Sequence, residues 1–103
     1  MKKFFIIFVL SLLLSVNAKA YTVVGTTPCG EILSRQNEKL TEESVIFYVS
    51  GYITGRNAES SGIVGRGVDY DSIFWATIKY CKDNPLNDTA DAAKNIYLKL
   101  KNK

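Results

Sequence analysis

The two cysteines of this chain, Cys29 and Cys81, place the strongest constraint on its fold. Because there are only two, a single intramolecular pairing is available, and it would close a loop of 52 residues. The chain-entropy account of cross-linking assigns such a bond about 4 kcal/mol. A redox-active or metal-binding pair would need a Cys-x-x-Cys arrangement or further His and Cys ligands, and the sequence has neither. We therefore expect a structural disulfide, with no metal and no cofactor.

The first twenty residues have the form of a secretory signal peptide. Lys2 and Lys3 precede a nearly unbroken apolar run, Phe4–Val16, and Ala18-Lys19-Ala20 has the small-x-small form of a cleavage site. The run is shorter than the roughly 20 residues that a membrane-spanning helix needs. We expect cleavage after Ala20, export of residues 21–103, and no membrane attachment once the signal is removed. Export also provides the oxidising compartment in which a disulfide forms.

Removing the signal changes the charge of the chain. The full sequence has 13 basic and 10 acidic residues, and three of the lysines (Lys2, Lys3 and Lys19) lie in the signal. Residues 21–103 therefore carry ten of each and no net charge, so the composition does not favour nucleic-acid binding. A chain of this length forms one small domain, whose limited core commonly requires a covalent brace.

The spacing of apolar residues predicts four helices. The first runs from Pro28 to about Arg35, with Thr27 as N-cap, and the second from Thr41 to about Ala58. The third lies in Asp71–Pro85 and is capped by Asp69 or Asp71. Asn84-Pro85 ends it and starts the last helix, with Asn84 as N-cap and Pro85 in the first turn. Residues 21–26 are expected to form an extended lead-in. The prediction is an all-α, small four-helix domain with one disulfide linking helix 1 to helix 3.

The predicted core gathers on the faces of the later helices. Phe74, Ile78 and Cys81 share one face of the third helix, and Trp75 extends it sideways. The last helix is expected to bury one face, made of Leu86, Thr89, Ala93, Ile96, Tyr97 and Leu100. The core residues predicted from these patterns are Val45, Val49, Tyr52, Phe74, Trp75, Ile78, Ile96 and Leu100.

Glycines mark the second helix and the segment after it. Gly51 and Gly55 lie four residues apart, a spacing that lets another helix approach closely; a binding role is the alternative. The segment Glu59–Val68 has no helical period, and it lacks the Gly-Lys-Ser/Thr ending of a phosphate-binding loop. Three polar residues around it, Arg56, Asn57 and Arg66, are expected to be exposed and are the candidate partner-binding residues; solubilising a mobile loop is the alternative role.

The sequence contains no histidine, which removes the commonest general base and the commonest metal ligand. With both cysteines paired, no Ser-His-Asp, Cys-His or zinc arrangement can be built. Asp69 and Asp71 are two residues apart, so they point to different sides of a helix, and we interpret them as caps. We expect a protein that is not an enzyme and has no catalytic residues.

Several motifs together resemble a known family. They are Cys29 opening the first helix, GYITGRN at Gly51–Asn57, DSIFxxxxKYCxxNPL at Asp71–Leu86 and TADAA at Thr89–Ala93. This pattern resembles the small periplasmic proteins grouped with the HdeA/HdeB acid-stress chaperones, and particularly their uncharacterised relatives. The resemblance covers nearly all of residues 21–103.

The resemblance implies a periplasmic location in a Gram-negative bacterium and one disulfide between the first and third helices. For the founding members it also implies self-association at neutral pH, here a homodimer, and binding of unfolded client proteins in strong acid. Protonating all ten carboxylates would take residues 21–103 from no net charge to about +10.

Two other roles remain open on the sequence. The Gly51–Asn57 segment and the last helix also resemble periplasmic immunity proteins of type VI secretion effectors. A dedicated immunity protein or inhibitor would use residues 51–68 to contact its partner. The third role is a disulfide-stabilised accessory protein without a defined activity.

Overall fold

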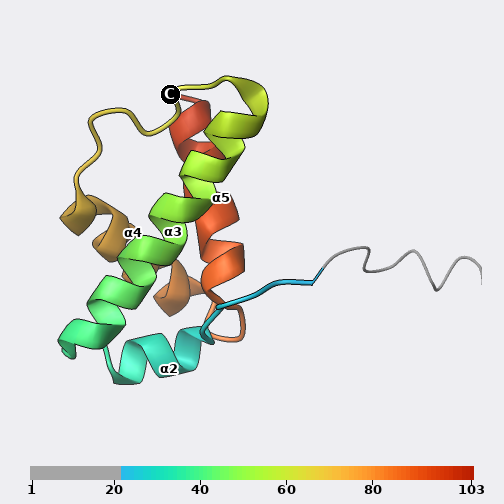
Figure 1. Cartoon of the computed structure of the whole chain (residues 1–103). Coiled ribbons are helices and arrows are strands. Elements are labelled where there is room, and N and C mark those ends of the chain that lie inside the picture. Colours follow the sequence, from blue (N-terminus) through green and yellow to red (C-terminus); the bar gives the residue numbers. More distant parts are fainter. Residues whose placement is uncertain (1–21) are drawn as a thin grey trace, which may run out of the picture.

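The computed structural model describes residues 22–103 and contains four α-helices in that range (Figure 1). They are α2 (Cys29–Ser34), α3 (Lys39–Ser60), α4 (Tyr70–Asp83) and α5 (Thr89–Lys101). The predicted all-helical domain with four helices is confirmed. The predicted signal peptide, residues 1–20, lies outside the described residues.

Helix α4 contacts each of the other three helices, and α3 packs against both α4 and α5. In Figure 1, α3 crosses in front of α4 and α5, and α2 lies across one end of the group. Helix α4, the third of the predicted helices, therefore contacts every other helix of the described residues.

The predicted disulfide joins α2 to α4. Cys29 is the first residue of α2 and Cys81 lies in the last turn of α4; their Cα atoms are 5.0 Å apart and both residues are fully buried. The bond links the first described helix to the third, as expected.

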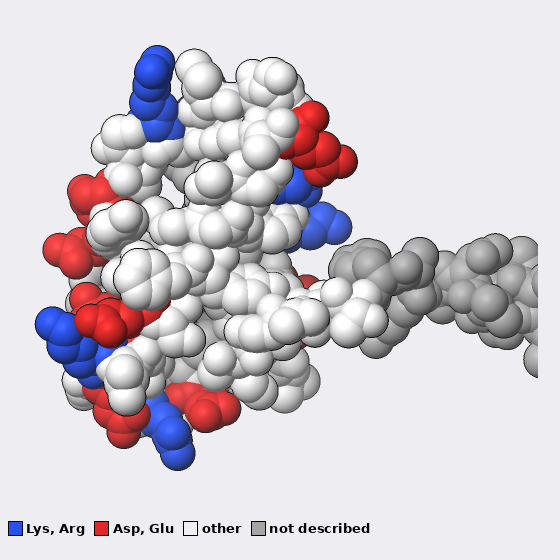
Figure 2. All heavy atoms as spheres, in the orientation of Figure 1, with Lys and Arg blue, Asp and Glu red and all other residues white. Residues whose placement is uncertain are grey.

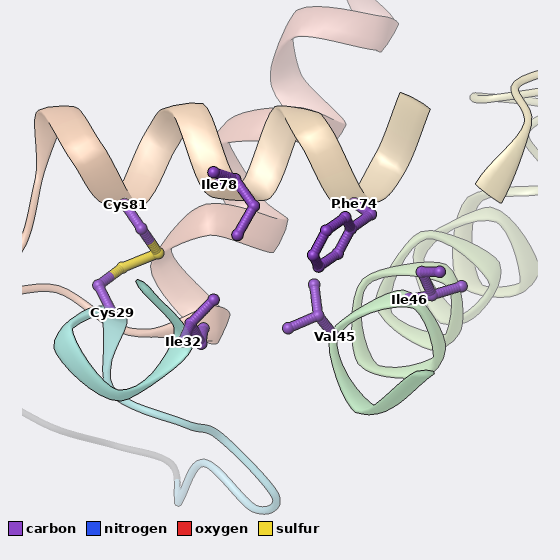
Figure 3. Close-up of a cluster of buried hydrophobic side chains, with 7 residues drawn as sticks. All are labelled: Cys29, Ile32, Val45, Ile46, Phe74, Ile78 and Cys81. Carbon is purple, nitrogen blue, oxygen red and sulfur yellow. A yellow bond between two sulfur atoms is a disulfide. The ribbon is translucent and has the colours of Figure 1, made fainter. Parts of the chain in front are cut away.

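A first core cluster surrounds this disulfide (Figure 3). Phe74 of α4 points toward Val45 of α3, and Ile78 points toward Ile32 of α2. Ile46 of α3 completes the buried set. Helices α2, α3 and α4 thus all contribute side chains to the cluster that contains the disulfide. The bond itself ties the short α2 to α4.

A second core cluster lies between α3, α4 and α5. Its buried members are Val49, Ile53, Ile73, Ala93, Ile96 and Tyr97. Tyr52 and Leu100 pack at its edge and are half-buried. Of the predicted core residues, Val45, Val49, Phe74, Ile78 and Ile96 are therefore buried.

Two predicted interior residues face outward instead. Trp75 is 60% exposed, because a helix turns about 100° per residue and Trp75 lies beyond the edge of the buried face. Leu86 is 98% exposed, because it lies in the turn between α4 and α5 and not on α5. The predictions that Trp75 is a core residue and that Leu86 belongs to the buried face of the last helix were wrong.

The lead-in before α2 is extended and is held by Thr89. The Thr27 N–H donates to Thr89 Oγ1 (2.9 Å), and the Thr89 hydroxyl and N–H both donate to the Thr27 carbonyl oxygen. Thr27 is therefore engaged with the start of α5, and Pro28 is the N-cap of α2 without a side-chain hydrogen bond. The prediction of Thr27 as N-cap was wrong.

The starts of α4 and α3 can be compared with the predicted caps. Asp69 caps α4 by accepting from the Ser72 N–H, one of the two expected alternatives. Helix α3 begins at Lys39, before the predicted Thr41, because Glu42 N–H already bonds to the Glu38 carbonyl.

The start of α5 also differs from the prediction. Asn84 is the C-cap of α4, and Asn84-Pro85 starts no helix. Instead Asp88 and Asp91 form a reciprocal capping box that begins α5 at Thr89.

Candidate functional site

The outward side of α3 is an exposed helix surface without charged residues along most of its length. Helical spacing brings six exposed residues to this side, which we call the α3 face: Ser44, Phe47, Gly51, Thr54, Gly55 and Ala58. No charged residue occurs in α3 between Ser44 and Gly55. Figure 2 shows that the middle of this view is free of charged side chains, which lie around its edge. Depletion of charged residues at the centre, with polar residues around the rim, is a feature of protein-binding surfaces.

Phe47 is the large apolar side chain of the α3 face. Its side chain is 66% exposed, and it lies opposite Val45, Ile46 and Val49, which point into the core. Exposing a phenylalanine in the middle of an uncharged surface costs solvation free energy that a binding partner can recover.

Gly51 and Gly55 leave the α3 face flat beside Phe47. A Cβ atom at either position would meet no atom within 4 Å. The expectation that these glycines let a helix of the same domain approach closely was therefore wrong. The flat surface that they create is open to solvent.

Two more aromatic side chains are exposed on α4. Trp75 stacks edge-on against the buried Phe74, with ring centroids 5.3 Å apart, and Tyr70 begins the helix with 60% of its surface exposed. The contact with Phe74 holds the Trp75 ring in place while most of its surface stays in solvent.

Arg56, expected to be an exposed contact residue, instead joins α3 to α5. Its Nη1 donates to the Tyr52 hydroxyl at 2.8 Å, and its guanidinium lies 4.5 Å from the ring centroid of Tyr97. The hydrogen bond to Tyr52 and the nearby tyrosine rings raise the pKa of Arg56, so it stays charged. Arg56 is half-buried and structural.

Asn57 is also used by the fold. Its Nδ2 donates to the Val64 carbonyl at 2.9 Å, and its Oδ1 accepts from the Val64 N–H at 3.0 Å. These two bonds anchor the segment after α3 to the helix. Asn57 is half-buried, so the expectation that it is exposed was wrong.

Arg66 is the one of the three candidate residues that is exposed. It lies in the segment 63–68, which we call the turn wall, between α3 and α4. Gly65 has a positive φ of 81°, and an added Cβ would approach Ile53 and Leu100, so the wall lies close against the second core cluster.

The turn wall separates two open hollows. The α3 hollow, about 340 Å³, has a floor that includes Ile53 and Ile73. The α5 hollow, about 410 Å³, lies between the wall and the end of α5, with Leu100, Lys101 and Lys103 in its lining. Ile63, Val64, Gly65, Arg66 and Val68 line both hollows.

Residues 22–103 contain no group of three or more His, Cys, Asp or Glu side chains placed to hold a metal ion. Within the same range no helix has the length and apolarity to cross a membrane.

Comparisons with protein families, with curated proteins and with solved structures found no match to this chain.

Two features of the site, an exposed apolar residue on α3 and the uncharged face around it, could have been predicted from the sequence. Val45–Val49 is a run of five apolar residues, and a helix cannot bury all five on one side, so one of them had to be exposed. The absence of charge from Ser44 to Gly55 was also visible. The hollows had no such signal, because residues 63–68 and the end of α5 meet only in the folded chain.

Proposed function

We propose that this protein is a non-enzymatic, exported stress protein that binds unfolded client proteins under acid conditions, in the manner of a holdase chaperone. The observation that carries the proposal is the α3 face, which presents Phe47 on a flat, uncharged surface. Unfolded chains expose apolar side chains, and such a surface lets them bury part of that area without desolvating charges.

The acid condition and the periplasmic location in this proposal rest on the resemblance to the HdeA/HdeB group. The charge balance of residues 21–103 supports it, because losing ten negative charges in acid would make the domain strongly cationic and favour its expansion. The disulfide supports it as well, because a covalent link between α2 and α4 keeps an expanded chain from separating fully.

The test is an aggregation assay with a model client at pH 2–3 and at pH 7, with and without reductant. The proposal predicts that the purified domain suppresses client aggregation at low pH. Phe47→Ser should weaken that suppression. Leu86→Ser is the matched control, because Leu86 is exposed and apolar but lies away from α3. Failure to suppress aggregation at both pH values would exclude the holdase function.

A second candidate is a dedicated protein-binding role, of the immunity or inhibitor type. The two hollows beside the turn wall favour it, because they are formed in the folded domain and need no unfolding to be accessible. A stable stoichiometric partner recovered from the periplasm and released by Arg66→Glu would support this role. Recovery of no such partner would count against it.

A further inference from the structure

The walls of the two hollows differ in charge from the rest of the domain. Arg66, Lys101 and Lys103 contribute to their lining, and no Asp or Glu side chain does. Residues 21–103 as a whole have equal numbers of acidic and basic side chains, so this excess of positive side chains is local to the hollows. The nearest carboxylates in sequence, Asp69 and Asp71, flank Tyr70 at the start of α4, and Asp69 is occupied in capping that helix.

Apolar side chains line both hollows as well. Ile53 and Ile73 lie in the α3 hollow, Leu100 lies in the α5 hollow, and Val64 and Val68 contribute to both. Ile63, at the crest of the wall, is exposed. A ligand that matches this surface has apolar groups next to negative charges.

The turn wall is preformed. Asn57 holds the backbone of Val64 through two hydrogen bonds, the Gly62 N–H donates to the Asn57 carbonyl, and the Val68 N–H donates to the Gly65 carbonyl. A surface fixed in this way loses little conformational entropy when a ligand binds.

From these observations we propose that the turn wall and its two hollows bind an acidic segment of a partner protein, with apolar side chains in the hollows and carboxylates on Arg66, Lys101 and Lys103. The hollows are open, and a pocket for a small molecule or lipid chain normally encloses most of its ligand. A protein segment needs only to place single side chains in them. This inference deepens the second candidate function and does not rest on the holdase proposal.

The test uses the folded domain at pH 7 and a short fluorescein-labelled peptide in which Glu residues flank two leucines. Fluorescence anisotropy gives the Kd, and backbone amide shifts in NMR spectra locate the contact. Binding should shift the resonances of residues 63–68 and 101–103, and it should weaken as salt screens the charges. Any affinity tag belongs at the N-terminal side, away from Lys103.

Variants separate a specific site from general attraction. The triple variant Arg66→Gln, Lys101→Gln, Lys103→Gln should weaken binding by about tenfold, given the usual strength of exposed charge pairs. The matched control replaces three cations outside the hollows, Lys79→Gln, Lys82→Gln and Lys94→Gln, and should leave the Kd unchanged. A peptide with Lys in place of Glu should not bind.

Three results would overturn the inference. The first is that the two triple variants weaken peptide binding equally. The second is that the amide shifts are confined to the α3 face, and the third is that the acidic peptide does not bind while a fatty-acid probe such as laurate binds the hollows. Each result is independent of the aggregation assay, so failure here and failure of the holdase proposal can be told apart.

Discussion

At the scale of single residues, polar side chains around the turn wall are structural where the sequence suggested contact. Arg56 packs against Tyr97 and Asn57 holds Val64, and only Arg66 is free to meet a partner among these three. Polar residues beside a glycine-rich segment look alike in a sequence whether they anchor the segment or project from it. The difference depends on tertiary contacts with α5 and with the segment itself.

Replacing Asn57 with Ala tests the structural role. Loss of the two hydrogen bonds to Val64 leaves a partly buried N–H and carbonyl without partners, so the free energy of unfolding should fall by about 1–3 kcal/mol. Urea unfolding followed by circular dichroism measures this. Asn37→Ala, at an exposed position, is the control and should have little effect. Equal stability of the Asn57 variant and the wild type would show that the wall does not depend on this anchor.

At the scale of helices, the spacing of apolar residues predicted all four helices. Where each helix begins depended on which of several possible capping residues makes the cap. Asp69 was among the predicted caps, because it precedes a strong apolar pattern. Asn84-Pro85 was not a helix start, because the Asp88–Asp91 pair satisfies two N–H groups at once. The outward orientation of Trp75 was missed because periodicity identifies the buried face of a helix more reliably than the edges of that face.

The Asp69 cap makes α4 sensitive to pH. The hydrogen bond from the Ser72 N–H lowers the pKa of Asp69 in the folded state. A lowered pKa stabilises the fold above the pKa of the unfolded chain, about 4, and that contribution is lost as the pH falls through the folded-state pKa.

The Asp69→Asn variant should therefore have a lower Tm than the wild type at pH 7, and the difference should shrink below about pH 4. Thermal unfolding across a pH series measures it, with Asp83→Asn, at the exposed end of α4, as the charge-matched control. A Tm difference that stays constant down to pH 2.5 would contradict this account of the cap.

At the scale of the whole molecule, the disulfide and the two core clusters together stabilise the domain. The bond closes a loop of 52 residues, and α2 is only six residues long, too short to hold its place by helix formation alone. The cysteine pair was predictable from the sequence because two cysteines leave one connectivity. The uncharged α3 face and the cationic hollows belong to the assembled surface, and only the first left a trace in the sequence.

Removing the disulfide should destabilise the domain more than any change described above. The double variant Cys29→Ser, Cys81→Ser should lose about 4 kcal/mol of unfolding free energy, a large part of a small domain's stability. Urea unfolding at pH 7 measures it, and reductant should affect the wild type but not the variant. A loss below about 1 kcal/mol would mean that the core clusters alone fix α2 against α4.

The most direct test of the client-binding account is site-specific photo-crosslinking. A benzophenone amino acid replaces Phe47 on the α3 face in one protein and Leu86 in another, and each is irradiated with an unfolding client at pH 2–3. Both positions are apolar and exposed, at 66% and 98%. The account predicts crosslinks to client from position 47 well in excess of those from position 86. Equal crosslinking from the two positions, or more from position 86, would contradict it.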